Sequence, residues 1–166
     1  MDDEKPNQIR NVIEQSNPAF KTNPDLLQVY IDQGQIISTG AQSLSFEYQY
    51  TLNVIITDYA EDIAKIIVPV LAYLKVNQPE IFDNPQRREG AFKFVTDFNN
   101  NNTLDLSLEI KLTERVVQKS GENGEINLKY ATEPTWNTES ELTAEELKVI
   151  LEDSVIFDRE KLYGND

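Results

Sequence analysis

The sequence contains neither cysteine nor histidine. Without cysteine there is no disulfide, no thiolate nucleophile and no cysteine-ligated metal, so stability has to come from packing. Without histidine the chain lacks the commonest general base and the usual zinc ligand. Because the sequence also shows no glycine-rich phosphate loop, nucleophile elbow or metal triad, we predict that the protein is not an enzyme and uses no cofactor or metal.

Long apolar runs and basic residues are scarce as well. The longest apolar run, residues 66–74, falls well short of the ~20 residues of a membrane-spanning helix, and the acidic N-terminus lacks a signal-peptide pattern, so we expect a soluble cytoplasmic protein. Fifteen Lys and Arg residues against 29 Asp and Glu residues give a formal net charge of −14. This charge predicts no nucleic-acid binding; it suits solubility, or attraction to a basic protein surface.

Two stretches alternate strictly between apolar and polar residues. Every second residue from Leu44 to Ile56 is large and apolar, and residues 104–112 repeat the pattern. This period of two predicts two long strands with one buried and one wet face, the second continuing through a glycine turn as a hairpin over 104–130. At ~3.3 Å per residue the first strand would extend roughly 40 Å, so we expect it to bend or project beyond the domain.

Helical spacing appears in two other segments. Residues 6–16 predict a short amphipathic N-terminal helix, and residues 58–77 predict the main core helix, with an N-cap at Thr57-Asp58 and a kink or restart at the internal Pro69. The apolar stripe of the core helix comprises Ile63, Ile66, Ile67, Val70, Leu71 and Leu74.

The predicted fold is an α+β two-layer domain over residues 1–132, in which a mainly antiparallel sheet packs on the kinked helix and the N-terminal helix. A strand or strand pair is expected after Leu27, with a turn or bulge at Gly34, and a further strand near the phenylalanines of 92–98. Residues 133–166 read as an acidic linker and arm. There, KVIL and SVIF predict either a helix, with a capping box at Thr143 and Glu146, or a small hairpin.

The acidic and amide side chains near residue 100 resemble a calcium loop in their spacing. Asn102 stands where the loop needs glycine, however, and Leu108 stands where it needs a bidentate glutamate. An asparagine-rich turn explains this segment better, because asparagine tolerates left-handed backbone conformations.

The projecting ends of the long strands are the candidate interaction sites, because an overhanging strand can pair with a neighbour. Phe46 and Tyr48 lie on the first strand, and Glu114, Arg115 and Val117 on the second. Arg115 can pair with a carboxylate of a neighbouring subunit or form an ordinary strand-end ion pair. Trp136 either anchors the arm on its own domain or inserts into a pocket of a partner.

Four segments, KTNPDLLQVYIDQG, SLSFEYQYTLNVIITD, IIVPVLAYLKVNQPEI and LTER, occur in an order and spacing that closely resemble the tail completion protein R (GpR) family of contractile-tailed temperate bacteriophages. The resemblance covers about residues 20–115, includes Pro69, and weakens after Glu122. It implies a tail-terminator-like structural protein of the virion that completes the tail at its head-proximal end and prepares it for joining to the head.

The resemblance also implies a ring of identical subunits, six by analogy with related tail terminators. The implied partners are copies of itself, the tail tube or sheath, and head-tail connector proteins, met in the host cytoplasm during assembly and then in the virion tail. Two other classes stay open from the residues alone: an acidic inhibitor that mimics DNA, and a hydrolase that uses paired carboxylates.

Overall fold

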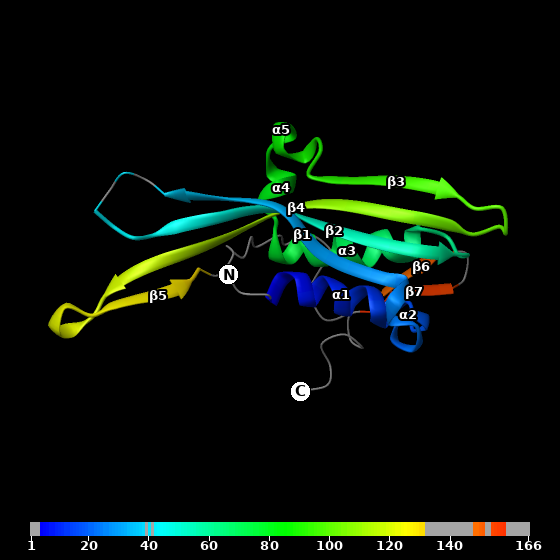
Figure 1. Ribbon diagram of the computed structural model, residues 1–166, viewed down its shortest axis with the longest axis horizontal. Coiled ribbons are helices and arrows are strands. Elements are labelled where there is room, and N and C mark those ends of the chain that lie inside the picture. Colours follow the sequence, from blue (N-terminus) through cyan, green and yellow to red (C-terminus); the bar gives the residue numbers. More distant parts are fainter. Residues whose placement is uncertain (1–3, 39, 41, 132–147, 152–153, 159–166) are drawn as a thin grey trace.

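The computed structural model describes residues 4–38, 40, 42–131, 148–151 and 154–158 (Figure 1). Five strands form an antiparallel sheet: β1 (Leu27–Ser38), β2 (Phe46–Tyr59), β3 (Phe92–Phe98), β4 (Leu104–Ser120) and β5 (Ile126–Tyr130). The order is β1-β2-β4-β3, and β5 pairs with β4. The helices are α1 (Glu4–Ser16), α2 (Ala19–Thr22), α3 (Ala64–Asn77), α4 (Glu80–Asp83) and α5 (Pro85–Arg88), with 3-10 turns η1 (Pro24–Leu26) and η2 (Glu122–Gly124). The predicted α+β class is confirmed.

The core lies between the sheet and a layer made by α1 and α3, which run along one face of the sheet (Figure 1). Alternate residues of β2 and β4 point into it, as the period of two requires: Tyr50, Leu52, Val54, Ile56, Leu106, Leu108, Ile110 and Leu112. The helices contribute Ile9, Val12, Ile13, Ile66, Val70, Tyr73 and Leu74. The predicted two-layer arrangement, with one wet sheet face, is therefore present.

The start of the core helix differs from the prediction. Residues 57–59 belong to β2, and Asp58 has a positive φ of 54°, so Thr57-Asp58 is not an N-cap. β2 continues because Tyr59 pairs with Leu104 beyond an irregularity in the register. Asp62 accepts from the first helical N–H groups instead: its Oδ1 accepts from the Ala64 N–H at 2.8 Å and its carbonyl from the Lys65 N–H at 3.0 Å. The buried face also shifts, to Ile66, Pro69, Val70, Tyr73 and Leu74.

Helix α3 continues across Pro69 as a single helix, so the predicted restart is wrong. Proline has no N–H, which leaves the carbonyl of Lys65 without its usual intrahelical donor. The side chain of Asn17 supplies the missing bond: its Nδ2 donates to the Lys65 carbonyl at 3.1 Å and to the Ile13 carbonyl at 3.2 Å. Asn17 is 5% exposed, so this pairing lies inside the helical layer.

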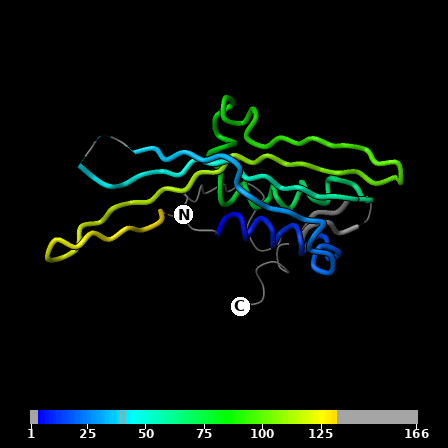
Figure 2. The backbone as a smooth tube through the Cα atoms, viewed as in Figure 1, coloured from blue at the N-terminus to red at the C-terminus, as the bar shows by residue number. Residues whose placement is uncertain are grey.

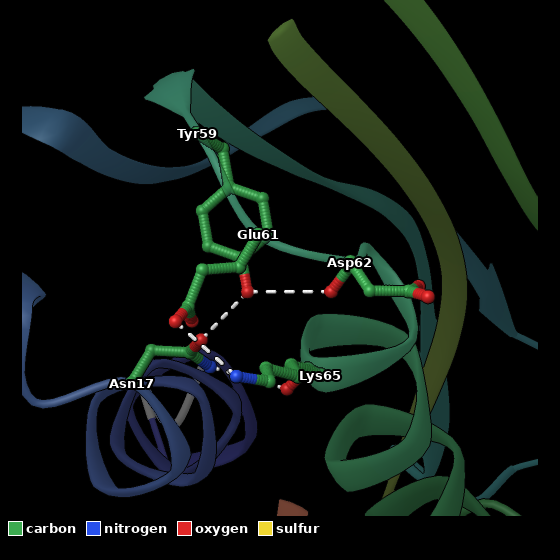
Figure 3. A network of polar contacts seen from close by, with 5 residues as sticks. All are labelled: Asn17, Tyr59, Glu61, Asp62 and Lys65. Atoms are coloured by element: carbon green, nitrogen blue, oxygen red, sulfur yellow. Dashed lines mark hydrogen bonds and ion pairs between the residues drawn. The ribbon is translucent and has the colours of Figure 1, made fainter. Parts of the chain in front are cut away.

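The same asparagine connects the helices to the end of β2 (Figure 3). The Tyr59 hydroxyl donates to Asn17 Oδ1 at 2.8 Å, and Lys65 pairs with Glu61 at 3.2 Å. Burial raises the pKa of Tyr59 far above its usual value, and the charges of Glu61 and Asp62 add to the effect. Tyr59 therefore stays protonated and remains a donor.

Two smaller predictions are resolved. The asparagine-rich segment is a turn, in which Asn102 has φ 61° and the Asn99 N–H donates to the Thr103 carbonyl at 2.9 Å. No group of potential metal ligands occurs among the described residues.

KVIL and SVIF form an antiparallel hairpin, β6 (Lys148–Leu151) with β7 (Ser154–Asp158), and β7 lies beside α3. The proposed capping box at Thr143 and Glu146 falls outside the described residues.

Candidate interaction surface

The β1–β2 and β4–β5 hairpins extend past the helices at one end of the molecule (Figures 1 and 2). β2 has 14 residues and β4 has 17, whereas the mode for globular proteins is about 5–6 residues. The predicted projection of the long strands is confirmed. Among the described residues, no helix lies beneath this end of the sheet face that carries the core further along the strands.

Apolar side chains continue on that face past the end of the described helices. In the register of the sheet, Ile36 pairs with Tyr48, Phe46 pairs with Val116, and Val116 pairs with Tyr130. Ile36 is 67% exposed and Leu128 56%. We call this the overhang surface and define it by Ile36, Phe46, Tyr48, Ile126, Leu128 and Tyr130. A contiguous apolar face of this kind is a candidate interaction site.

Hydrogen bonds attach β4 to the helical layer at Thr113, where the overhang begins. β3 and β5 pair with different parts of the same edge of β4 and leave a gap between them. The chain passes across this gap from α3 to α4, and the fully buried Gln78 fills it. Its Oε1 accepts from the Thr113 N–H at 3.3 Å and from Lys5 Nζ at 2.9 Å, while Lys5 also donates to the Thr113 carbonyl at 2.7 Å. Side chains thus replace the missing strand neighbour.

Five of the six predicted interaction residues come together at this end, on two faces. Tyr48 pairs with Glu114, and Phe46 packs edge-to-face on Tyr48 with ring centroids 5.0 Å apart. These three lie on the overhang side of the sheet, with Glu114 only 6% exposed. Arg115 and Val117 point to the opposite face, because strand side chains alternate. Trp136, the sixth, lies outside the described residues.

The opposite face carries a polar groove of about 770 Å³. Arg115 lies in it with Lys111 and Arg87, and the carboxylates of Glu47, Glu80 and Glu89 balance these cations. No ion pair joins Arg115 to a carboxylate within the described residues, so the ordinary strand-end ion pair is not seen there. A groove of balanced charge suits contact with a polar chain segment.

Strand β3 is a surface that the sequence did not reveal. Phe94, Val95 and Phe98 are 57%, 63% and 83% exposed. The phenylalanines were predicted to lie in a strand, which they do, but none of the described helices covers Phe94 or Phe98. The one available signal was that residues 94 and 95 are both apolar and therefore point to opposite faces, which is unusual for a strand with one wet side.

Comparisons of the sequence with known proteins show its family. The family model of the P2 phage tail completion protein R (GpR) matches residues 3–134. The chain is 43% identical over 130 residues to the tail completion protein R of Escherichia phage P2, which covers 78% of this chain and 83% of that protein. No solved structure gave a significant match, and none of the described helices is long and apolar enough to cross a membrane. The chain belongs to the P2 phage tail completion protein R (GpR) family, whose members are structural proteins of bacteriophage tails.

Proposed function

We propose that this protein completes the tail at its head-proximal end as a ring of identical subunits and prepares the tail for joining to the head. It would meet tail tube, sheath and connector proteins in the host cytoplasm and remain in the virion. The observation that supports this most is the overhang surface: the long strands extend past the described helices and carry exposed apolar side chains there, among them Ile36 and Leu128, which a neighbouring protein could bury.

The overhang suits contact with a neighbouring protomer or the end of the tube. Phe46, Tyr48 and the exposed Leu128 offer an apolar face, while Arg115 on the other face has no carboxylate partner in the described part of the chain. A neighbour can bury the first and pair with the second, which makes the contact both apolar and directional.

Charge sets the conditions under which such a ring forms. Six copies would carry 6 × (−14) = −84 charges, and this repulsion opposes association unless salt or a basic partner screens it. The isolated protein should therefore be mostly monomeric at low ionic strength and form rings at high ionic strength or on the tail tube. Light scattering across a salt series measures this; a tight oligomer at low salt would contradict it.

The function itself is tested in phage particles. Lysates of a phage that lacks this gene should contain heads and separate tails of irregular length when viewed by electron microscopy, and supplying the gene in trans should restore complete virions. If deletion leaves normal virions, the proposed function is wrong. If it removes heads and tails alike, the protein acts before tail completion.

A further inference from the structure

The outer edge of strand β3 pairs with no other strand among the described residues, and its only charged residues are Lys93 and Asp97. It contains neither proline, glycine nor a bulge along Phe92–Phe98, and its pairing with β4 is in continuous register. Edge strands of this kind normally carry such devices, because an open apolar edge invites pairing with another chain. Phe94 and Phe98 on the helix side and Val95 on the other side make this edge apolar on both faces.

The opposite edge of the sheet offers a matching segment in the second half of β1. Residues 33–38 are all exposed, and they follow the irregularity at Ile31/Gln33 that separates them from the first half of the strand. They belong to a stretch, residues 33–46, without a single charged residue. At the chain average of 27% these 14 residues would include about four, so a strongly acidic protein has a neutral edge here.

We propose that residues 33–38 of one copy pair with β3 of the next copy, so that the sheet continues from subunit to subunit around the ring. The inference rests on the ring of the proposed function and names the two surfaces that meet in it. They are different surfaces, as a ring requires, because a contact between identical patches would close at a dimer.

Strand polarity favours this pairing. Neighbouring strands in the order β1-β2-β4-β3 are antiparallel throughout, so β1 and β3 run in opposite directions. A second copy placed beside the first in the same orientation therefore brings its β3 antiparallel to β1, and the alternation of strands is unbroken. β5 is a poorer candidate. Val116 pairs with both Phe46 and Tyr130, so β5 lies on the same side of β4 as β3 and cannot replace β1 as the partner of β3: pairing β3 of one copy with β5 of another would join like edges and favour a two-fold dimer.

The side chains match when Ile36 lies opposite Phe94. In this register Gln33–Ser38 pair with residues Phe92–Asp97, and apolar residues stay on their own faces. Ile36 and Phe94 meet on the helix side as a β-branched and aromatic pair, and on the other side Ile37 lies diagonal to Val95. The only charges in the contact are Lys93 and Asp97, which sum to zero, so it adds no repulsion of its own.

The offset that this register requires is compatible with closure. Within one copy, the paired residues Val95, Ser107, Ile55 and Gln28 lie in one row across the sheet, so Val95 and Gln28 are at the same height along the strands. The proposed register instead places Val95 opposite Gln35 of the neighbour. The two β1 residues are six ladder positions apart on β2 (55 − 49 = 6), or about 20 Å. Four strands are about 19 Å wide, so the strands would tilt by about 45°, near the usual 35–45° of closed sheets.

Engineered disulfides test the register, and the absence of natural cysteine makes the readout clean. In Ile36→Cys/Phe94→Cys the two thiols lie on opposite edges of one copy and can meet only between copies. Mild oxidation at high ionic strength should give a ladder of covalent oligomers on a denaturing gel that ends at the closed ring. An equimolar mixture of the two single variants should stop at dimers, and Ile37→Cys/Phe94→Cys, with its thiols on opposite faces, should give no ladder.

The outcomes separate the two proposals. If wild-type rings form under the same conditions but the Ile36→Cys/Phe94→Cys variant shows no species above a dimer, this pairing is wrong and the ring stands. If wild type forms no ring at any salt concentration or on tails, the proposed ring fails and the pairing with it. Both side chains are exposed in the monomer, at 67% and 57%, so the variants should fold, as circular dichroism will verify.

Discussion

Replacing Asn17 with alanine should cost much of the stability of the helical layer. The change removes the donor to the Lys65 carbonyl (3.1 Å), the donor to the Ile13 carbonyl (3.2 Å) and the acceptor of the Tyr59 hydroxyl (2.8 Å). Ile13 retains its backbone partner, the Asn17 N–H at 2.9 Å. The Lys65 carbonyl and the Tyr59 hydroxyl lose their best partners, at about 1–3 kcal/mol for each group, so we expect Asn17→Ala to lower the free energy of unfolding by about 2–4 kcal/mol.

Pro69 makes this prediction specific. In a Pro69→Ala background the new N–H of residue 69 can bond the Lys65 carbonyl, four residues earlier, so Asn17 is no longer its required donor. The loss on Asn17→Ala should therefore be about 1 kcal/mol smaller in that background than with Pro69 present. Urea denaturation of the four proteins of the cycle, followed by circular dichroism, measures the difference.

Tyr59→Phe is the matched control. It removes the hydroxyl that donates to Asn17 and leaves the Asn17 amide on the Lys65 carbonyl, so its cost, about 1 kcal/mol, should not depend on Pro69. Equal losses for Asn17→Ala in both backgrounds would refute the idea that the asparagine compensates for the proline. An unchanged stability for Asn17→Ala would show that the buried network contributes nothing.

Three further changes test other parts of the molecule. Gln78→Leu leaves the Thr113 N–H without its side-chain acceptor and should lower the free energy of unfolding by about 1–3 kcal/mol, measured by urea denaturation. Hydrogen bonds from the Asp58 N–H and the side chain of Asn99 lower the pKa of Asp105. The ionised Asp105 therefore stabilises the fold above the pKa of an unfolded aspartate, and this contribution is lost as the pH falls through the lower pKa of the folded protein. NMR titration of the carboxyl group and acid unfolding measure the two effects. Val117→Pro removes the N–H that faces β5, because the next N–H, of Gln118, bonds Ser45 on the β2 side. β5 carries Leu128 and Tyr130 of the overhang surface, so the monomer should stay folded and its ring formation in light scattering should weaken, whereas the contact between β1 and β3 is left intact.

Alternation was sufficient to predict β2 and β4, because one face of each strand is buried along most of its length and the period of two is then unambiguous. It could not predict where the helical layer ends. Tyr50 and Tyr48 continue the same pattern, yet Tyr50 is buried and Tyr48 is half-buried, because the difference depends on α1 and α3, which come from elsewhere in the chain. The predicted interaction residues were placed at the projecting end, but their division between two faces required the register with β4 and β5.

Other features depend on contacts between distant segments and had no sequence signal. Asn17 looked like an ordinary residue at the end of a helix, and nothing in its neighbourhood points to a proline 52 positions later. In the sequence, Gln78 is only the residue between the predicted core helix, which ends at residue 77, and Pro79, whereas in the structure its side chain completes the edge of a strand. The end of β2 at Tyr59 was missed because Asp58 adopts a positive φ, which propensity assigns to a turn or cap rather than to a strand.

The distribution of charge connects the fold with the proposed assembly. Residues 135–166 lie beyond the part matched by the family and contain three basic and nine acidic residues, a net charge of −6, which leaves −8 for residues 1–134. Within that matched part, both edges of the sheet that we expect to meet are neutral. Repulsion therefore acts between the bodies of the subunits while attraction acts only at short range along the edges, so screening decides whether a ring forms and the edges decide its geometry. Neutralising acidic residues beyond 134 should accordingly lower the salt concentration needed for assembly and leave the disulfide ladder of the Ile36→Cys/Phe94→Cys variant unchanged.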